Sequence, residues 1–123
     1  MFQVVGTNPV GREARLIEAV DYLEKEKNFK LVLKLLSIGN ELEFPETYFR
    51  SGRVLQYAKE HEKAFSMFLR AARLGHPDAQ HQLSIMYANG TGVQRDTRQS
   101  IHWLRQASDG GNKYARAKLK ALQ

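Results

Sequence analysis

The side chains of this 123-residue chain that are best able to bind a metal ion are four histidines. They are His61, His76, His81 and His102. A helix places two ligands on one face when they are three or four residues apart, and no two of these histidines have that spacing. The chain also has no cysteine, so thiolate ligands and thiolate nucleophiles are absent. The sequence favours ordinary surface histidines, and we expect no metal and no other cofactor.

A glycine-rich turn and the aspartate that follows it form a second candidate site. Gly90 and Gly92 lie in a stretch reading Asn-Gly-Thr-Gly-Val, but the Lys-Ser/Thr pair of a phosphate-binding loop does not follow. Asp96 stands three residues before Gln99, which is the spacing of a helix N-cap, and it has no nearby partner for acid catalysis. No nucleophile, base and orienting group can be assembled from the sequence, so we expect that the chain is not an enzyme.

Helical periodicity flanks this turn on both sides. Apolar residues recur every three or four positions, first at Ala79, Leu83 and Tyr87 and then at Ile101, Leu104 and Ala107. The pattern restarts after 36 residues, since Gly75 recurs as Gly111 and Leu83 as Leu119. A fixed period of this length indicates stacked helical repeats.

The residues from 75 to 111 also carry a family resemblance. They resemble one full Sel1-like repeat, a variant of the tetratricopeptide (TPR) class, at Ala79, Leu83, Tyr87, Gly90, Gly92, Val93, Asp96, Trp103, Ala107 and Gly111. The chain departs from the family pattern at Ser84 and Ser100, where the family has glycine and alanine. Both replacements are small, so close helix packing is retained.

Constant spacing extends the repeat to the rest of the chain, and the earlier part is TPR-like. We therefore expect an all-α protein, a right-handed α/α solenoid of about three antiparallel helix hairpins with a C-terminal capping helix. It forms a single domain of residues 1–123 with a flexible arm at 1–11, hairpins at 12–39, 45–74 and 77–110, and a cap at 113–122. The 77–110 hairpin is the Sel1-like one.

Glycines and apolar runs give three local expectations. The pair Gly39 and Asn40 is predicted to end a helix that begins at Phe29. That helix is apolar on more than one side, which indicates that it is sandwiched between neighbours. Gly52 lies inside a helix, where it costs about 1 kcal/mol relative to alanine. We expect that the facing helix comes too close there for a side chain.

The first helix of each hairpin is expected to line a concave face. The partner-binding residues predicted on it are Asp21, Glu24, Glu46, Phe49, Arg53, Gln56, Asp78, His81 and Ile85. Phe49 has two interpretations: an exposed aromatic anchor at the centre of this face, or a side chain packed under its neighbours.

The resemblance to Sel1-like and TPR proteins implies a non-catalytic adaptor or scaffold that binds a peptide or a partner protein on the concave face. A dedicated chaperone or inhibitor of one partner is a more specific version of this function. Self-association through the apolar repeat ends is a further expectation. We see no signal peptide, and no apolar stretch approaches the ~20 residues that cross a bilayer, so we expect a cytoplasmic protein that does not bind membranes.

The net charge of +6 suggests an alternative function. The excess of basic residues falls at the C-terminal end, where the candidate patch is Arg105, Lys113, Arg116, Lys118 and Lys120. Such a patch could serve a nucleic-acid-binding accessory protein. Tyr114 is the one aromatic residue within it, so base stacking would be limited, and nucleic acid is the less favoured partner. The other interpretation is a solvated outer face of the capping helix.

Overall fold

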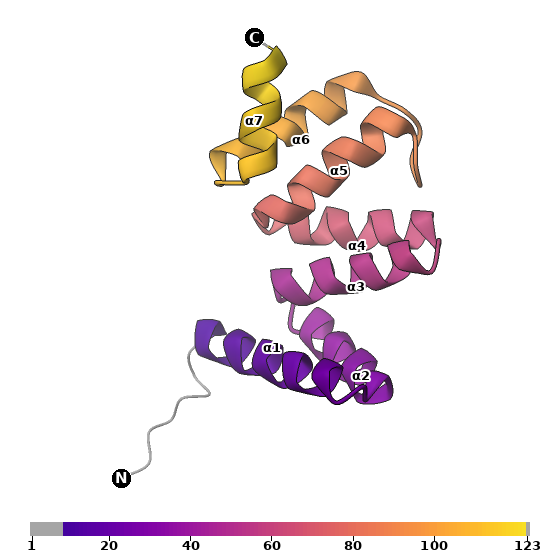
Figure 1. Ribbon diagram of the computed structural model, residues 1–123, viewed down its shortest axis with the longest axis vertical. Coiled ribbons are helices and arrows are strands. Elements are labelled where there is room, and N and C mark those ends of the chain that lie inside the picture. The colour runs from indigo at the N-terminus through magenta and orange to yellow at the C-terminus, as the bar shows by residue number, and fades with distance from the viewer. Residues whose placement is uncertain (1–8, 123) are drawn as a thin grey trace.

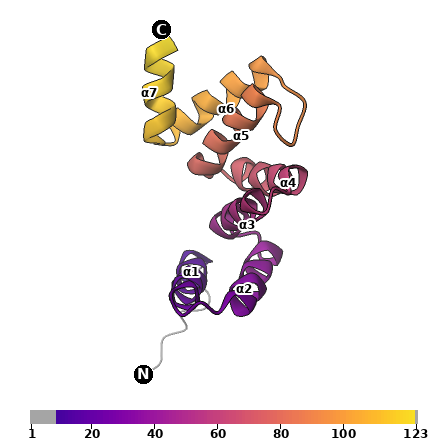
Figure 2. The same ribbon diagram turned by 45° about the vertical axis from the view of Figure 1, so that its right-hand side comes forward.

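The computed structural model describes residues 9–122, and all regular secondary structure in that range is helical (Figure 1). The helices are α1 (Pro9–Lys25), α2 (Phe29–Glu41), α3 (Pro45–Tyr57), α4 (His61–Arg73), α5 (Pro77–Asn89), α6 (Thr97–Asp109) and α7 (Lys113–Leu122). Each helix packs mainly on its neighbours in sequence, so the chain rises as a stack of hairpins from α1 and α2 at one end to α7 at the other (Figures 1 and 2). The predicted all-α solenoid is confirmed.

Local capping explains where the helices begin. Pro45 and Pro77 occupy the first position of α3 and α5, where the missing N–H of proline is not needed. The Nδ1 atom of His76 accepts a hydrogen bond from the backbone N–H of Ala79 at 3.1 Å and caps α5. The Oδ1 atom of Asp96 accepts one from the N–H of Gln99 at 3.1 Å, which confirms the predicted N-cap of α6.

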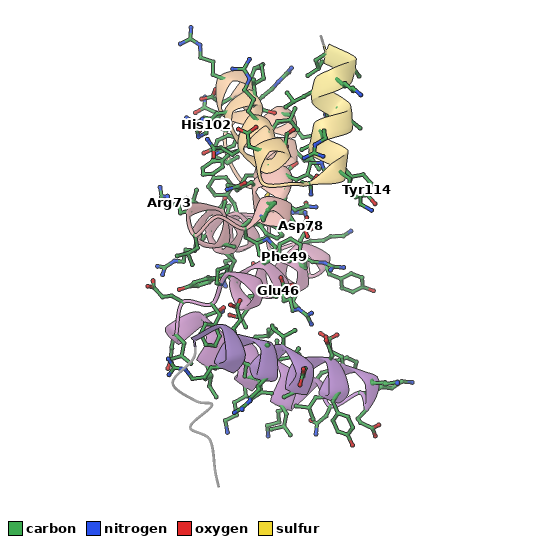
Figure 3. All side chains as sticks on the ribbon, turned by 90° about the vertical axis from the view of Figure 1, so that its left-hand side faces the viewer. Glu46, Phe49, Arg73, Asp78, His102 and Tyr114 are labelled. Carbon is green, nitrogen blue, oxygen red and sulfur yellow. The ribbon has the colours of Figure 1, made fainter. Side chains whose placement is uncertain are left out.

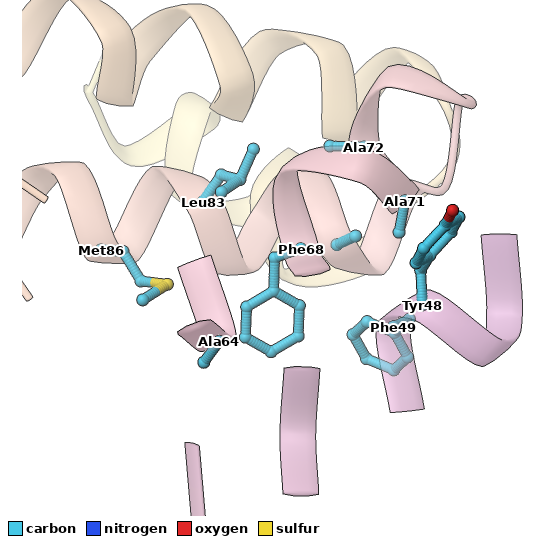
Figure 4. Close-up of a cluster of buried hydrophobic side chains, with 9 residues drawn as sticks. Tyr48, Phe49, Ala64, Phe68, Ala71, Ala72, Leu83 and Met86 are labelled. Carbon is cyan, nitrogen blue, oxygen red and sulfur yellow. The ribbon is translucent and has the colours of Figure 1, made fainter. Parts of the chain in front are cut away.

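The main hydrophobic core lies between α3, α4 and α5 (Figure 4). Phe68 of α4 is fully buried at its centre. A Cβ atom at Gly52 of α3 would lie 2.7 Å from the ring of Phe68, closer than real Cβ contacts. The expected close approach at Gly52 is confirmed, because a facing side chain fills the space that its own would take. Smaller buried clusters lie between α1 and α2 and between α6 and α7.

The first hairpin departs from two expectations. α1 begins at Pro9, three residues before the expected start at Arg12, whereas residues 1–8 of the predicted arm lie outside the described part of the chain. Gly39 does not end α2, which continues to Glu41. A Cβ at Gly39 would lie 2.7 Å from the Cβ of Thr47, so this glycine serves the packing of α2 on α3.

The expectation that α2 is sandwiched between neighbouring helices is confirmed only in part. α2 packs on α1 and α3, and it leaves large apolar side chains exposed at Phe29, Leu31, Leu33 and Ile38, with Leu42 just beyond its end. Among residues 9–122, none of the helices has both the length and the apolar character needed to cross a lipid bilayer.

The contact between Gly52 and Phe68 yields a test of the core. Gly52→Ala should lower the free energy of unfolding by about 1–3 kcal/mol, because the buried ring cannot move aside and overpacking outweighs the gain in helix propensity. In a Phe68→Leu background the same substitution should cost less, since the ring is gone. Chemical denaturation of the four proteins in this cycle measures both costs, and equal costs in the two backgrounds would contradict the assignment.

Candidate functional site

A groove opens between α1 and α3 on the side of the solenoid where the concave face was expected. It encloses about 510 Å³ and is lined by Asp21, Glu24, Glu46, Arg50, Arg53, Val54 and Tyr57. Four of these residues, Asp21, Glu24, Glu46 and Arg53, belong to the set predicted from the sequence. The structure therefore brings together the two α1 members of that set and two of its four α3 members.

A polar network centred on Glu46 forms the floor of the groove. Arg50 donates from Nη1 to Oδ1 of Asp21 at 2.6 Å and from Nε to Oε1 of Glu46 at 3.3 Å. Glu46 contacts Nε2 of His76 through its Oε2 atom at 2.7 Å. Because Nδ1 of His76 already accepts the capping hydrogen bond, Nε2 carries the hydrogen and donates to Glu46. The backbone N–H of Glu46 donates to Oε1 of Glu13 at 3.2 Å, so three successive hairpins meet here.

The network shifts the titration of its charged members. Burial alone would raise the pKa of the Glu46 carboxyl, but hydrogen bonds and charges from His76 and Arg50 outweigh it and hold the pKa below its usual value. Burial acts to lower the pKa of Arg50, and its bonds to Asp21 and Glu46 more than offset this, so the pKa is raised. Both groups therefore stay charged and serve to hold the groove together.

Phe49 lies beneath this network rather than in the groove. Its side chain is 8% exposed, its ring stacks on the imidazole of His76 at 4.6 Å between centroids, and it packs against Phe68 in the core (Figure 4). The guanidinium of Arg53 covers the ring at 5.8 Å from the centroid. Of the two interpretations offered by the sequence, the structure favours a side chain packed under its neighbours.

The groove keeps three groups that the network does not use. Arg53 has no carboxylate within ion-pair distance among residues 9–122. Val54 is 42% exposed and Tyr57 is 93% exposed, one and four residues further along α3. A cation without an ion pair and an exposed aromatic ring next to it are both available to contact a binding partner.

The remaining predicted residues lie on α3 and α5, further along the solenoid. Gln56 contacts Gln82 at 3.5 Å, and Asp78 accepts a hydrogen bond from the side-chain amide of Asn112 at 2.8 Å. His81 stacks on Tyr114 of α7 at 5.9 Å between ring centroids, and Ile85 is half-buried. Figure 3 places Asp78 and Tyr114 toward one edge of the molecule and Arg73 and His102 toward the other.

The environment of His81 favours its neutral form. Burial lowers the pKa of the imidazole, and the positive charge of Lys118 lowers it further, while Asp78 acts weakly in the opposite direction. The neutral imidazole of His81 stacks on Tyr114 and adds no positive charge to this part of the predicted face.

The basic residues of the alternative patch do not share one surface. On α7, the 100° turn per residue puts Lys113, Arg116 and Lys120 on one side and Lys118 about half a turn away. Lys118 acts on His81 of α5, one of the residues of the predicted partner-binding face. Arg105 lies on α6 in a shallow hollow with Arg98 and Ile101. The five residues are therefore spread over several faces.

A second hollow, of about 590 Å³, lies between α4, the 93–96 loop and α6. Arg73, Arg95 and Trp103 are among its lining residues, and none of the residues lining it was predicted as a site. The indole Nε1 of Trp103 is buried without a partner among the described residues. Both hollows join two hairpins, and we favour the α1–α3 groove as the site because it places the exposed side chains of Val54 and Tyr57 beside the cation of Arg53.

The sequence could have indicated Arg50 and His76, which were not predicted as site residues. Glu46 and Arg50 are four residues apart on a predicted helix, the spacing of an ion pair. His76 stands directly before Pro77, at the N-cap position of a helix whose first residue is proline. The bond between Glu46 and His76 spans 30 residues and leaves no local signal.

Comparison with known proteins decides the family. The Sel1 repeat model matches residues 50–76 and 77–112, just over half of the chain. The chain belongs to the Sel1 repeat family. The second match confirms the repeat recognised from Gly75 to Gly111, and the first shows that the preceding hairpin, read from the sequence as TPR-like, is also a Sel1 repeat.

Solved structures agree with this assignment. A Sel1 repeat protein from Oxalobacter formigenes is 30% identical, with a TM-score of 0.71, over 76% of this chain and 28% of that one. The protein c5321 of uropathogenic Escherichia coli, a protective antigen with an SLR fold, is 27% identical, with a TM-score of 0.58, over 65% of this chain and 18% of that one. This Sel1 chain thus spans less than a third of the length of either relative.

The fold also matches that of a chain of similar size. Helicobacter pylori cysteine rich protein B has a TM-score of 0.70 at 20% identity, over 85% of this chain and 95% of that one. Sel1 repeat proteins mediate protein–protein interactions, and the family is one of non-enzymatic interaction scaffolds.

The Glu46 network predicts a pH-dependent contribution to stability. Glu46→Gln should lower the free energy of unfolding at pH 7 by about 1–2 kcal/mol, because two charge-assisted hydrogen bonds are weakened. The folded-state pKa of Glu46 is depressed, so the difference between the two proteins should be full above the ordinary carboxylate pKa of about 4.3 and should vanish as the pH falls through the lower folded-state value.

Urea unfolding of both proteins across the acid range measures this difference. Glu24→Gln makes the same chemical change at another groove residue, one that has no ion pair among residues 9–122, and should change stability little at any pH. A Glu46→Gln effect that persists unchanged into strong acid would contradict the role of the charge.

Proposed function

We propose that this Sel1 chain is a non-catalytic adaptor that binds an extended segment of a partner protein in the α1–α3 groove. The observation that carries the proposal is the cation of Arg53, which has no ion pair among residues 9–122, beside the exposed ring of Tyr57 one turn further along α3. Interface hot spots are enriched in arginine and tyrosine, which supply a charge-assisted hydrogen bond and a large contact area.

The groove chemistry indicates what the partner segment carries. A carboxylate would be the complement of Arg53, because the other cation of the groove, Arg50, is already held by Asp21 and Glu46. An apolar or aromatic side chain next to that carboxylate would cover Val54 and Tyr57, which are otherwise left in water. We infer an acidic-apolar peptide motif as the ligand.

The rest of the predicted face would extend the contact along α5 and α7. Gln56, Asp78 and His81 offer polar groups there, and Tyr114, 72% exposed, offers a second aromatic surface. A dedicated chaperone or inhibitor of one partner would use the same groove with a longer segment. The scattered positions of the C-terminal basic residues give no support to nucleic-acid binding as a second function.

Selection of a displayed peptide library on the immobilised protein tests the proposal. Enriched peptides should contain Asp or Glu beside an apolar residue, and Arg53→Glu should weaken their binding by about tenfold or more, because the carboxylate then meets a like charge. Fluorescence anisotropy of labelled peptides measures the affinities. Phe49→Ala is unsuitable as a test, since truncating this buried ring should itself destabilise the fold by about 3–5 kcal/mol.

Arg98→Glu on α6 is the matched control, since it makes the same charge reversal away from the groove and should leave peptide binding unchanged. Peptides that bind wild type and Arg53→Glu equally well would overturn the groove assignment. A labelled oligonucleotide that binds tightly, with affinity falling steeply as salt rises, would move the function to the basic residues.

A further inference from the structure

One side of α2 carries an apolar stripe that residues 9–122 leave partly exposed. Leu31, Leu35, Ile38 and Leu42 are spaced by four, three and four residues, so they share one face of the helix and its C-cap. The exposed fractions of Leu31, Ile38 and Leu42 are 42%, 44% and 52%, and Leu35 is partly buried beside the α1–α2 cluster. A soluble surface seldom leaves such a row exposed without a partner.

This stripe lies at the end of the solenoid. α1 and α2 form the last hairpin at the N-terminal end in Figures 1 and 2, and α2 packs mainly on α1 and α3. Val32, Leu36 and Gly39 face those two helices and are buried. The Leu31–Leu42 side of α2 lies about a quarter turn from these buried residues, and among residues 9–122 most of it stays exposed.

We propose that this face of α2 pairs with the same face of a second copy, with the two helices antiparallel about a two-fold axis between Leu35 and Ile38. The spacing of four, three and four reads the same in both directions, so an antiparallel copy matches it layer by layer. Leu31 then meets Leu42 of the partner subunit, and Leu35 meets Ile38 of the partner subunit. This is the self-complementary contact that a two-fold dimer requires.

The charges beside the stripe select the antiparallel orientation. Lys34 and Glu41 flank the stripe on the same side, seven residues apart, and neither has an ion-pair partner among residues 9–122. In the antiparallel pair Lys34 lies near Glu41 of the partner subunit, and the two-fold axis makes this contact twice. In a parallel pair Lys34 and Glu41 of the partner subunit would lie on opposite sides of the contact, so this ion pair could not form. Apolar pattern and charge thus agree on one arrangement.

The size of the contact sets the expected affinity. One 13-residue helix on each copy gives an interface at the small end of specific contacts, so we expect a reversible dimer with a dissociation constant on the order of tens of micromolar. The groove between α1 and α3 stays open in this dimer, because its lining residues lie on other helices. The pairing is therefore independent of peptide binding.

Sedimentation velocity of the full chain, over a concentration series reaching the millimolar range, tests the pairing. Wild type should shift from monomer to dimer, and Ile38→Glu should stay monomeric at every concentration because a charge would be buried against the apolar Leu35 of the partner subunit. Circular dichroism and thermal unfolding check that Ile38→Glu is folded, which the exposure of this side chain leads us to expect. A wild type that remains monomeric throughout would overturn the proposal.

A charge exchange tests the orientation without touching the apolar stripe. Lys34→Glu should weaken dimerisation by about tenfold, and adding Glu41→Lys in the same chain should restore it, because the pair is re-formed with its signs reversed. Lys63→Glu makes the same change at an exposed lysine of α4, on a different helix, and should leave the equilibrium unchanged. Failure of the double variant to recover, or a dimer that Ile38→Glu leaves intact, would rule out this antiparallel contact.

Discussion

The structure depends most on Glu46, which joins three helical hairpins through its carboxylate and its backbone N–H. It lies at the start of α3, it is bound by Arg50 of its own helix and by His76 at the start of α5, and its backbone N–H is bound by Glu13 of α1. The hydrophobic clusters of the first hairpin and of the centre are separate. The orientation of the first hairpin on the rest therefore relies on this polar junction and on the close packing of Gly39 against Thr47.

The Glu46 junction also explains how the α1–α3 groove can be rigid and still have side chains free to bind a peptide. The partly buried and paired groups, Glu46, Arg50 and His76, hold α1, α3 and the start of α5 in register. Their hydrogen-bonding capacity is used within the protein, so they have little left for a ligand. Arg53 and Tyr57 lie on the same helix but outside the network, with their positions fixed by it. A preformed groove of this kind lowers the entropic cost of binding a flexible peptide.

The helical repeat could be predicted from the sequence because its signals are local. Pro45 and Pro77 mark helix starts, Asp96 is a cap three residues before Gln99, and the period between Gly75 and Gly111 fixes the hairpin length. The membership of Asp21, Glu24, Glu46 and Arg53 in one groove followed from the same spacing. Gly52 was interpretable because a glycine inside a helix requires a close neighbour.

What the sequence did not reveal depends on contacts between distant segments. Phe49 has the same helical position whether it faces a groove or a core, and only the stacking of His76 over it decides between them. Gly39 was taken for a helix end because glycine is common there, whereas its contact is Thr47 of the next helix. Apolar residues on more than one side of α2 indicated that several of its sides are buried. The spacing of apolar residues does not tell whether the helix that would cover them belongs to the same chain.

Chemical-shift mapping of the isotope-labelled protein with a library-selected peptide tests the central claim most directly. The account predicts that the largest backbone shifts fall on α1 and α3 around residues 21–24 and 50–57, with smaller changes along α5 and α7. Shifts confined to α6 and the outer basic side of α7, with α1 and α3 unchanged, would contradict the groove as the binding surface of this Sel1 repeat protein.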